Sequence, residues 1–256
     1  MNIYLIVLMS FVAAASGIVG SFALHRRMSL VADAFSHVAL PGIGLAFLAH
    51  SNPLYGGIIA ILLGAIIIWF LEERSQLPTE NIVGIIFIFS LALGAILTPE
   101  GEILEALFGG TPVIGTFEFA ISILLSFIVI VTMLIIRNKL TLISLSPEIA
   151  QSIGIKKSLY NFIFLIVFSL AVILGLKFLG ILLMGALIII PAAISKIFSW
   201  NQKSDMILSQ VFAIVSVNGG LWISHSYRLP LGPTIALVCF GLFIVGLVVK
   251  QLVWKK

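Results

Sequence analysis

Long apolar segments recur along the whole chain and are separated only by short polar stretches. A helix needs about 20 mainly apolar residues to cross the hydrocarbon core of a membrane, and no stretch remains that could form a separate soluble domain. Charged residues make up 9% of the chain and hydrophobic residues 61%, whereas about a quarter of a soluble domain is charged. The sequence therefore predicts an all-α, polytopic membrane helix bundle that forms a single domain over residues 1–256.

Nine segments are long enough to be membrane-spanning helices. The boundary hardest to place lies between residues 159 and 198, where only Gly175, Lys177 and Gly180 interrupt 40 mostly apolar residues. Eight spans with one re-entrant or broken helix are therefore the alternative to nine. The predicted segments are residues 3–24, 30–49, 54–71, 82–97, 117–136, 159–176, 179–198, 206–224 and 231–249.

The basic residues predict how the chain is oriented in the membrane. If the N-terminus lies outside, the 14 Lys and Arg residues all fall at the inner side except Lys177 and Arg228, as the positive-inside rule requires. The net charge of +4 therefore reports topology, and we expect no nucleic-acid partner. The inner residues are Arg26, Arg27, Arg74, Arg137, Lys139, Lys156, Lys157, Lys196, Lys203, Lys250, Lys255 and Lys256.

The outer loops carry groups that a metal cation would meet first. His50 and His225 fall in two of these loops, and they are candidates for an outer metal path. Ordinary solvated loop residues explain each of them equally well. The same loops also hold four glutamates, Glu100, Glu102, Glu105 and Glu118.

Asp33 and His37 lie four residues apart in the otherwise uncharged segment VADAFSHVALPGIGLAF. Ionisable side chains are costly in a bilayer and commonly mark a functional site, and positions i and i+4 share one face of a helix. A carboxylate and an imidazole together suit Zn²⁺, Mn²⁺ or Fe²⁺ better than Cu(I). A proton relay is the other function that this pair could serve. The alternative is that Asp33 caps the helix N-terminus while His37 fills the core.

Two ligands are too few for a metal that takes about four or more, but a two-fold dimer with both pairs on its axis would supply four. One turn further on, Pro41, Gly42 and Gly44 allow a kink and a close approach between helices. Simple packing of small residues explains them without any transport function.

The inner segment LSPEIAQSIGI, residues 145–155, predicts a short, self-terminated cytoplasmic helix. Ser146 suits the N-cap and Pro147 the first turn, Glu148 favours the positive end of the helix dipole, and Gly154 supplies a stop. The helix is either a docking element for a soluble partner or a capped loop. The chain contains no G-x-x-x-x-G-K-[ST] phosphate loop, so ATP hydrolysis by that mechanism requires another polypeptide.

The segment RRMSLVADAFSHVALPGIGLAF resembles the second-helix signature of the bacterial metal-ion ABC transporter permeases, which import zinc, manganese or iron. ENIVGIIFIFSLALGAIL, SPEIAQSIGI, LGLKFLGILLMGALIIIPAA and YRLPLGPTIAL agree as well, in order along nearly the full chain. The resemblance implies a homodimer in the bacterial plasma membrane that works with two cytoplasmic ATPase subunits and an extracytoplasmic metal-binding protein. It also implies that Asp33 and His37 coordinate the metal in transit, and that the segment 146–154, with Glu148 and Ala150, docks on the ATPase.

The leading hypothesis is a non-enzymatic permease subunit of an ATP-driven importer of zinc, manganese or iron, with no permanently bound cofactor. A self-sufficient proton-coupled metal carrier is the second reading. An intramembrane hydrolase built on Asp33, Ser36 and His37 is a third, although adjacent helical residues point about 100° apart and no HExxH or GxSxG motif is present. The fourth hypothesis is that the chain is a non-catalytic membrane scaffold.

Overall fold

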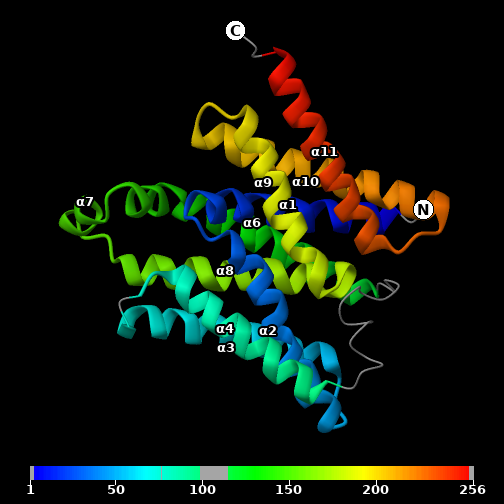
Figure 1. Cartoon of the computed structure of the whole chain (residues 1–256), viewed down its shortest axis with the longest axis horizontal. Helices are drawn as coiled ribbons and strands as arrows, with labels where there is room; N and C mark the ends of the chain where they lie inside the picture. The colour runs from blue at the N-terminus through cyan, green and yellow to red at the C-terminus, as the bar shows by residue number, and fades with distance from the viewer. Residues whose placement is uncertain (1–2, 76, 99–114, 254–256) are drawn as a thin grey trace.

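The computed structural model describes residues 3–75, 77–98 and 115–253, and these residues form helices without a strand (Figure 1). The predicted all-α membrane bundle is confirmed. In chain order the helices are α1 (Ile3–His25), α2 (Ser29–Leu48), α3 (Pro53–Ser75), α4 (Thr79–Leu97), α6 (Thr116–Leu145), α7 (Pro147–Ser152), α8 (Lys157–Leu179), α9 (Ile181–Phe198), α10 (Gln202–Tyr227) and α11 (Leu231–Val253).

Eight of the described helices are long and apolar enough to cross a membrane, namely α1, α2, α3, α4, α6, α8, α10 and α11. The described apolar part of α9, Met184–Phe198, is shorter. α8 and α9 separate at Gly180, whose φ of 77° lies in a region that glycine adopts without strain. The prediction of eight or nine spans is therefore confirmed, with α9 as the short helix.

Helix α1 lies at the centre of the bundle, between α6 and α8 on one side and α9 and α10 on the other (Figure 1). Helix α2 packs against α3, α4 and α9. Helices α3, α4, α6 and α11 expose many large apolar side chains, which is the surface expected of helices that face lipid tails. Among the eight candidate spans, α1, α2 and α8 are the most buried and are thus the ones that a polar site inside the protein can use.

Glycines allow the closest helix contacts. A Cβ at Gly42 of α2 would lie 2.1 Å from the backbone oxygen of Gly56 in α3, and a Cβ at Gly44 would lie 2.7 Å from Cβ of Leu97. Close backbone approach through small residues is a common way in which helices associate in membranes. Pro41 and its two glycines therefore lie where α2 meets α3 and α4.

We predict that Gly42→Ala destabilises the protein, because the new methyl group would meet the backbone of α3, which cannot rotate away. Overpacking of this kind costs roughly 1–3 kcal/mol. Gly84→Ala is the matched control, since a Cβ at Gly84 in α4 meets no atom within 4 Å, and alanine is the better helix former. Thermal unfolding in detergent should show a lower transition temperature for Gly42→Ala only; equal stability of the two variants would contradict this packing.

Candidate metal site

Asp33 and His37 both lie inside α2. The helix begins at Ser29, and its N-cap is Met28, so Asp33 occupies a position well within the helix. The alternative that Asp33 caps the N-terminus of this helix is therefore wrong. Because α2 begins four residues before Asp33, the Asp33 carboxylate does not accept hydrogen bonds from the free N–H groups at the start of the helix. It therefore remains available to a ligand.

The ring of His37 is oriented by the backbone of α2. Its Nδ1 atom lies 2.9 Å from the carbonyl oxygen of Asp33, and a carbonyl oxygen can only accept a hydrogen bond. Nδ1 therefore carries the proton in this arrangement, and Nε2 keeps its lone pair. A histidine ring held in one tautomer by a hydrogen bond to its other nitrogen is the usual arrangement of a metal ligand.

The carboxylate and the imidazole have different surroundings. The side chain of His37 is 10% exposed, that of Asp33 is 44% exposed, and His37 Nδ1 lies 3.8 Å from Asp33 Oδ1. Phe87 of α4 packs edge-on against the imidazole, with ring centroids 5.1 Å apart. Gly185 of α9 faces the carboxylate, since a Cβ there would lie 3.6 Å from Asp33 Oδ1. The pair thus combines a fixed imidazole with an accessible carboxylate.

One chain supplies an incomplete set of ligands. Among the described residues, no group of three or more His, Cys, Asp or Glu side chains is close enough to hold a metal ion. Pro41 has no N–H group, so it cannot donate a hydrogen bond to the carbonyl oxygen of His37, four residues before it. This carbonyl oxygen, close to the pair, therefore lacks its usual partner within the helix. Asp33 and His37 can therefore provide part of a coordination shell.

The outer histidines do not join this pair in the structure. His50 follows α2 in a left-handed conformation with φ 51°, and His225 lies in the last turn of α10; both are exposed. Glu118 lies in the first turn of α6. Glu100, Glu102 and Glu105 fall outside the described residues. His50 and His225 therefore remain candidates for an outer path rather than members of a formed site.

The hydroxyl of Ser36 does not pair with His37. Ser36 is fully buried, and its Oγ donates to the carbonyl oxygen of Ala32 over 2.8 Å. A nucleophile needs a base within hydrogen-bond reach, so the geometry gives no support to the hydrolase alternative.

The short helix predicted after residue 145 is α7. The N–H groups of Gly154 and Ile155 donate to the carbonyls of Gln151 and Ala150 over 3.0 and 2.9 Å, with Gly154 at φ 81°, which is the Schellman arrangement that ends a helix. Ser146 is the N-cap, but its side chain makes no capping hydrogen bond. The predicted N-cap position of Ser146 and the predicted stop at Gly154 are therefore both confirmed, although the Ser146 hydroxyl does not cap the helix.

Helix α7 has one buried residue, and three exposed apolar residues lie in it and on either side of it. Ala150 is buried against the bundle, whereas Glu148 points outward. The three exposed apolar residues form what we call the ridge: Leu145 ends α6, Ile149 lies in α7 and Ile153 follows α7, and all three are exposed. The sequence analysis did not single them out, although large apolar residues in a predicted inner loop were a visible signal.

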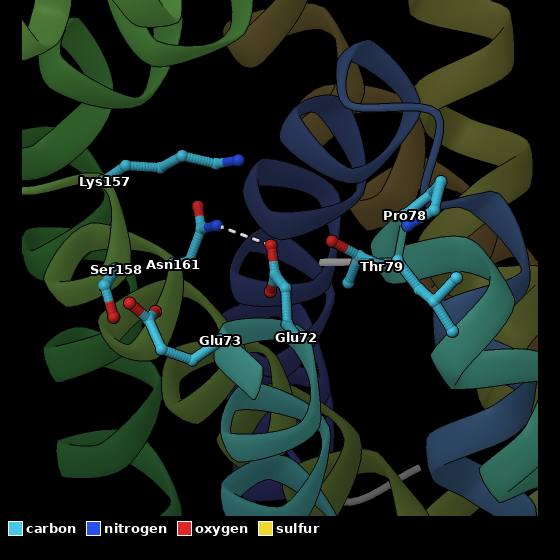
Figure 2. Close-up of a pocket in the computed structure, with 8 residues that line it drawn as sticks. Glu72, Glu73, Pro78, Thr79, Lys157, Ser158 and Asn161 are labelled. Carbon is cyan, nitrogen blue, oxygen red and sulfur yellow. Dashed lines mark hydrogen bonds between the residues drawn. The ribbon is translucent and has the colours of Figure 1, made fainter. Parts of the chain in front are cut away.

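A polar network that the sequence did not predict lies beside α7. Arg26 Nη2 donates to Asn161 Oδ1, and Asn161 Nδ2 donates to Glu72 Oε1 over 2.9 Å (Figure 2). Burial lowers the pKa of the Arg26 guanidinium, and the charge of Glu72 opposes that shift. Glu72 and Asn161 line a cleft of about 440 Å³ with Lys157 and Thr79. The network joins the α1–α2 turn to α3 and α8.

The bundle of membrane-spanning helices is that of an integral membrane protein, and comparison with known proteins identifies its family. Residues 3–250 match the model of the ABC 3 transport family, so the chain belongs to this family. It is a permease subunit and not an enzyme, and it spans the membrane several times.

Two relatives and one solved structure are similar to this chain along most of its length. It is 30% identical to the manganese import system permease protein ScaB of Streptococcus gordonii over 92% of this chain and 86% of that protein. It is 29% identical to the high-affinity zinc uptake system membrane protein ZnuB of Haemophilus influenzae, over 91% of both chains. PsaBC from Streptococcus pneumoniae, solved in complex with Fab, matches with a TM-score of 0.80 and 26% identity over 96% of this chain and 91% of that one.

Proposed function

We propose that this chain is a single transmembrane domain through which an ATP-driven importer carries divalent manganese or zinc, or iron, across the membrane, with Asp33 and His37 as the transient ligands of the ion. The observation that carries the proposal is the position of this pair inside the buried helix α2, with the free Nε2 of His37 and the accessible carboxylate of Asp33. Relatives named for manganese and for zinc support both ions. The ion is cargo, and no resident cofactor is required.

The incomplete ligand set favours a homodimer. Zn²⁺ takes about four ligands, and two copies of Asp33 and His37 on a two-fold axis supply four. The exposed side chain of Asp33 is available to such a partner. A shell shared between two chains can also be opened by moving one chain relative to the other, which lets the ion leave on the other side.

Two features of the chain indicate its partners: it has no phosphate-loop motif, and apolar residues are exposed at α7. ATP hydrolysis takes place on a separate cytoplasmic ABC ATPase subunit, and an extracytoplasmic metal-binding protein delivers the ion. The exposed ridge of Leu145, Ile149 and Ile153 suits an apolar groove on the ATPase, while the buried Ala150 fixes α7 on the bundle. Dependence on that ATPase distinguishes this mechanism from a proton-coupled carrier.

The orientation that we propose places α7 in the cytoplasm and the N-terminus outside. The α1–α2 turn, the end of α3 and the start of α7 share one cleft, which His25, Arg26, Arg27, Lys157 and Pro147 help to line. Basic residues that the positive-inside rule assigns to the cytoplasm therefore lie together at the end of the bundle that carries α7.

Asp33→Asn and His37→Ala should each abolish uptake of ⁵⁴Mn²⁺ or ⁶⁵Zn²⁺ without loss of expression, because the two protomers together would lose both carboxylate charges in the first variant and both imidazole ligands in the second. Asparagine keeps the size of the side chain and removes only its charge. Glu80→Gln, which removes an exposed carboxylate from the first turn of α4, is the control and should transport normally. Normal uptake by the Asp33→Asn variant in proteoliposomes with the ATPase would remove the metal-site assignment.

Ile149→Arg should weaken binding of the ATPase, because a charge replaces an apolar side chain at the centre of the ridge. Truncating or disrupting a central interface residue costs about 2 kcal/mol or more, which is roughly a 30-fold loss of affinity. Gln151→Arg adds the same charge to an exposed residue of α7 outside the ridge and should bind nearly normally. Pull-down with purified ATPase measures both; equal binding would rule out docking through the ridge.

Single cysteines test the orientation, since the native Cys239 is buried. Ser51→Cys, between α2 and α3, should react with a membrane-impermeant maleimide on intact cells. Ser144→Cys, near α7, should react only after permeabilisation. The reverse labelling pattern would show that the chain is inserted the other way round.

A further inference from the structure

A cleft rich in positive charge lies beside the start of α7. Its volume is about 360 Å³, within the range of roughly 300–1,000 Å³ that is usual for small-molecule sites. Three cationic side chains and a single carboxylate line it, and we call it the basic cleft. Its lining includes His25, Arg26, Arg27, Glu72, Thr79 and Lys157.

Two of the three positive charges in the basic cleft are not compensated. Arg26 donates to Asn161 and interacts with the charge of Glu72, so these two charges balance each other. Among the described residues, the exposed side chains of Arg27 and Lys157 make no ion pair and no hydrogen bond. The basic cleft therefore presents two free cationic groups, one from the α1–α2 turn and one from the start of α8.

The basic cleft lies at the depth of the lipid head groups. His25 is the last residue of α1, Thr79 is the first of α4 and Lys157 is the first of α8, and all three helices are long and apolar enough to span the membrane. Spanning helices leave the hydrocarbon core near their ends and pass into the polar head-group region. A negatively charged head group can therefore reach Arg27 and Lys157 from the membrane itself.

The neighbouring cleft of about 440 Å³ supplies an apolar side chain next to these charges. It shares Glu72, Thr79 and Lys157 with the basic cleft, and in Figure 2 the Lys157 side chain extends from α8 toward the side on which Glu72 and Thr79 lie. The exposed Leu77 lines the neighbouring cleft, as does Glu73, which repels an anion. An anion thus fits the basic cleft, and a phospholipid can place apolar atoms against Leu77, which a free phosphate ion cannot do.

We propose that the basic cleft binds the phosphate group of an anionic phospholipid, with Arg27 and Lys157 as the groups that hold it. Basic pockets between spanning helices are known to bind anionic head groups, and charge-assisted hydrogen bonds from guanidinium and ammonium groups to phosphate oxygens are among the strongest in proteins. The bound lipid joins the α1–α2 turn to the start of α8. Asp33 and His37 take no part in it, so this site does not depend on the proposed metal transport.

Native mass spectrometry of the full-length protein, in micelles containing equal amounts of phosphatidylglycerol and phosphatidylcholine, tests the site. The wild type should retain phosphatidylglycerol in preference to phosphatidylcholine. Each basic residue near a membrane surface contributes roughly fivefold to the binding of anionic lipid, so Arg27→Gly/Lys157→Gln should weaken retention about 30-fold. Glycine at position 27 should preserve the fold, because φ is 57° there and glycine adopts this conformation without strain. Arg27→Lys/Lys157→Arg keeps both charges and should retain the lipid.

Arg74→Gln/Lys203→Gln is the matched control, since it also removes two positive charges from exposed residues. Arg74 lies in the last turn of α3 and Lys203 in the first turn of α10, and neither lines the basic cleft. This control should retain phosphatidylglycerol as the wild type does. An equal loss in the control, or equal retention of the two lipids by the wild type, would overturn the site.

The same measurement distinguishes the other anions that could occupy the basic cleft. If inorganic phosphate at the same concentration displaced phosphatidylglycerol, the ligand would be a soluble phosphate and the lipid assignment would be wrong. If Arg27→Gly/Lys157→Gln kept the lipid but lost the ATPase in a pull-down, the cleft would belong to an acidic protein surface. The Asp33→Asn variant should lose metal uptake and keep the lipid, so the transport proposal and the lipid site can fail separately.

Discussion

The absence of water inside a bilayer is the constraint on which the whole structure depends. Backbone polar groups must find partners within the protein, which explains why the described residues form helices. Many hydroxyls follow the same rule, as when Ser36 donates to the carbonyl of Ala32 and Ser209 donates to Gly17 on a neighbouring helix. Against this background, the carboxylate of Asp33 stands out because it is 44% exposed although it lies inside a spanning helix.

The sequence was sufficient for the features that depend on composition and local spacing. Apolar length predicted the spanning helices, and Gly180 divides α8 from α9 within the stretch that was hardest to segment. Gly154 ends α7 as its conformational freedom suggested. The placement of Asp33 and His37 one turn apart inside a spanning helix was readable without a structure, and their role as ligands stays a prediction.

Other features depend on contacts between residues distant in sequence, and no local pattern reports them. Arg26 meets Asn161 across 135 positions, and Asn161 meets Glu72 across 89. The buried state of Asp205, which is 1% exposed in the first turn of α10, is hidden for the same reason, because its sequence context resembles an ordinary exposed helix start. The proposed N-cap role of Asp33 failed because the first residue of a helix is difficult to place from sequence. Long-range packing therefore added the polar network and the inner cleft.

The central claim is that a divalent ion is held by Asp33 and His37 from two copies of the chain. X-ray absorption spectroscopy of Zn²⁺ bound to the purified permease measures its ligands most directly. The account predicts only nitrogen and oxygen ligands at about 2.0–2.2 Å, with an imidazole contribution that disappears in the His37→Ala variant. Bound zinc with sulfur ligands, or a spectrum that His37→Ala leaves unchanged, would contradict it.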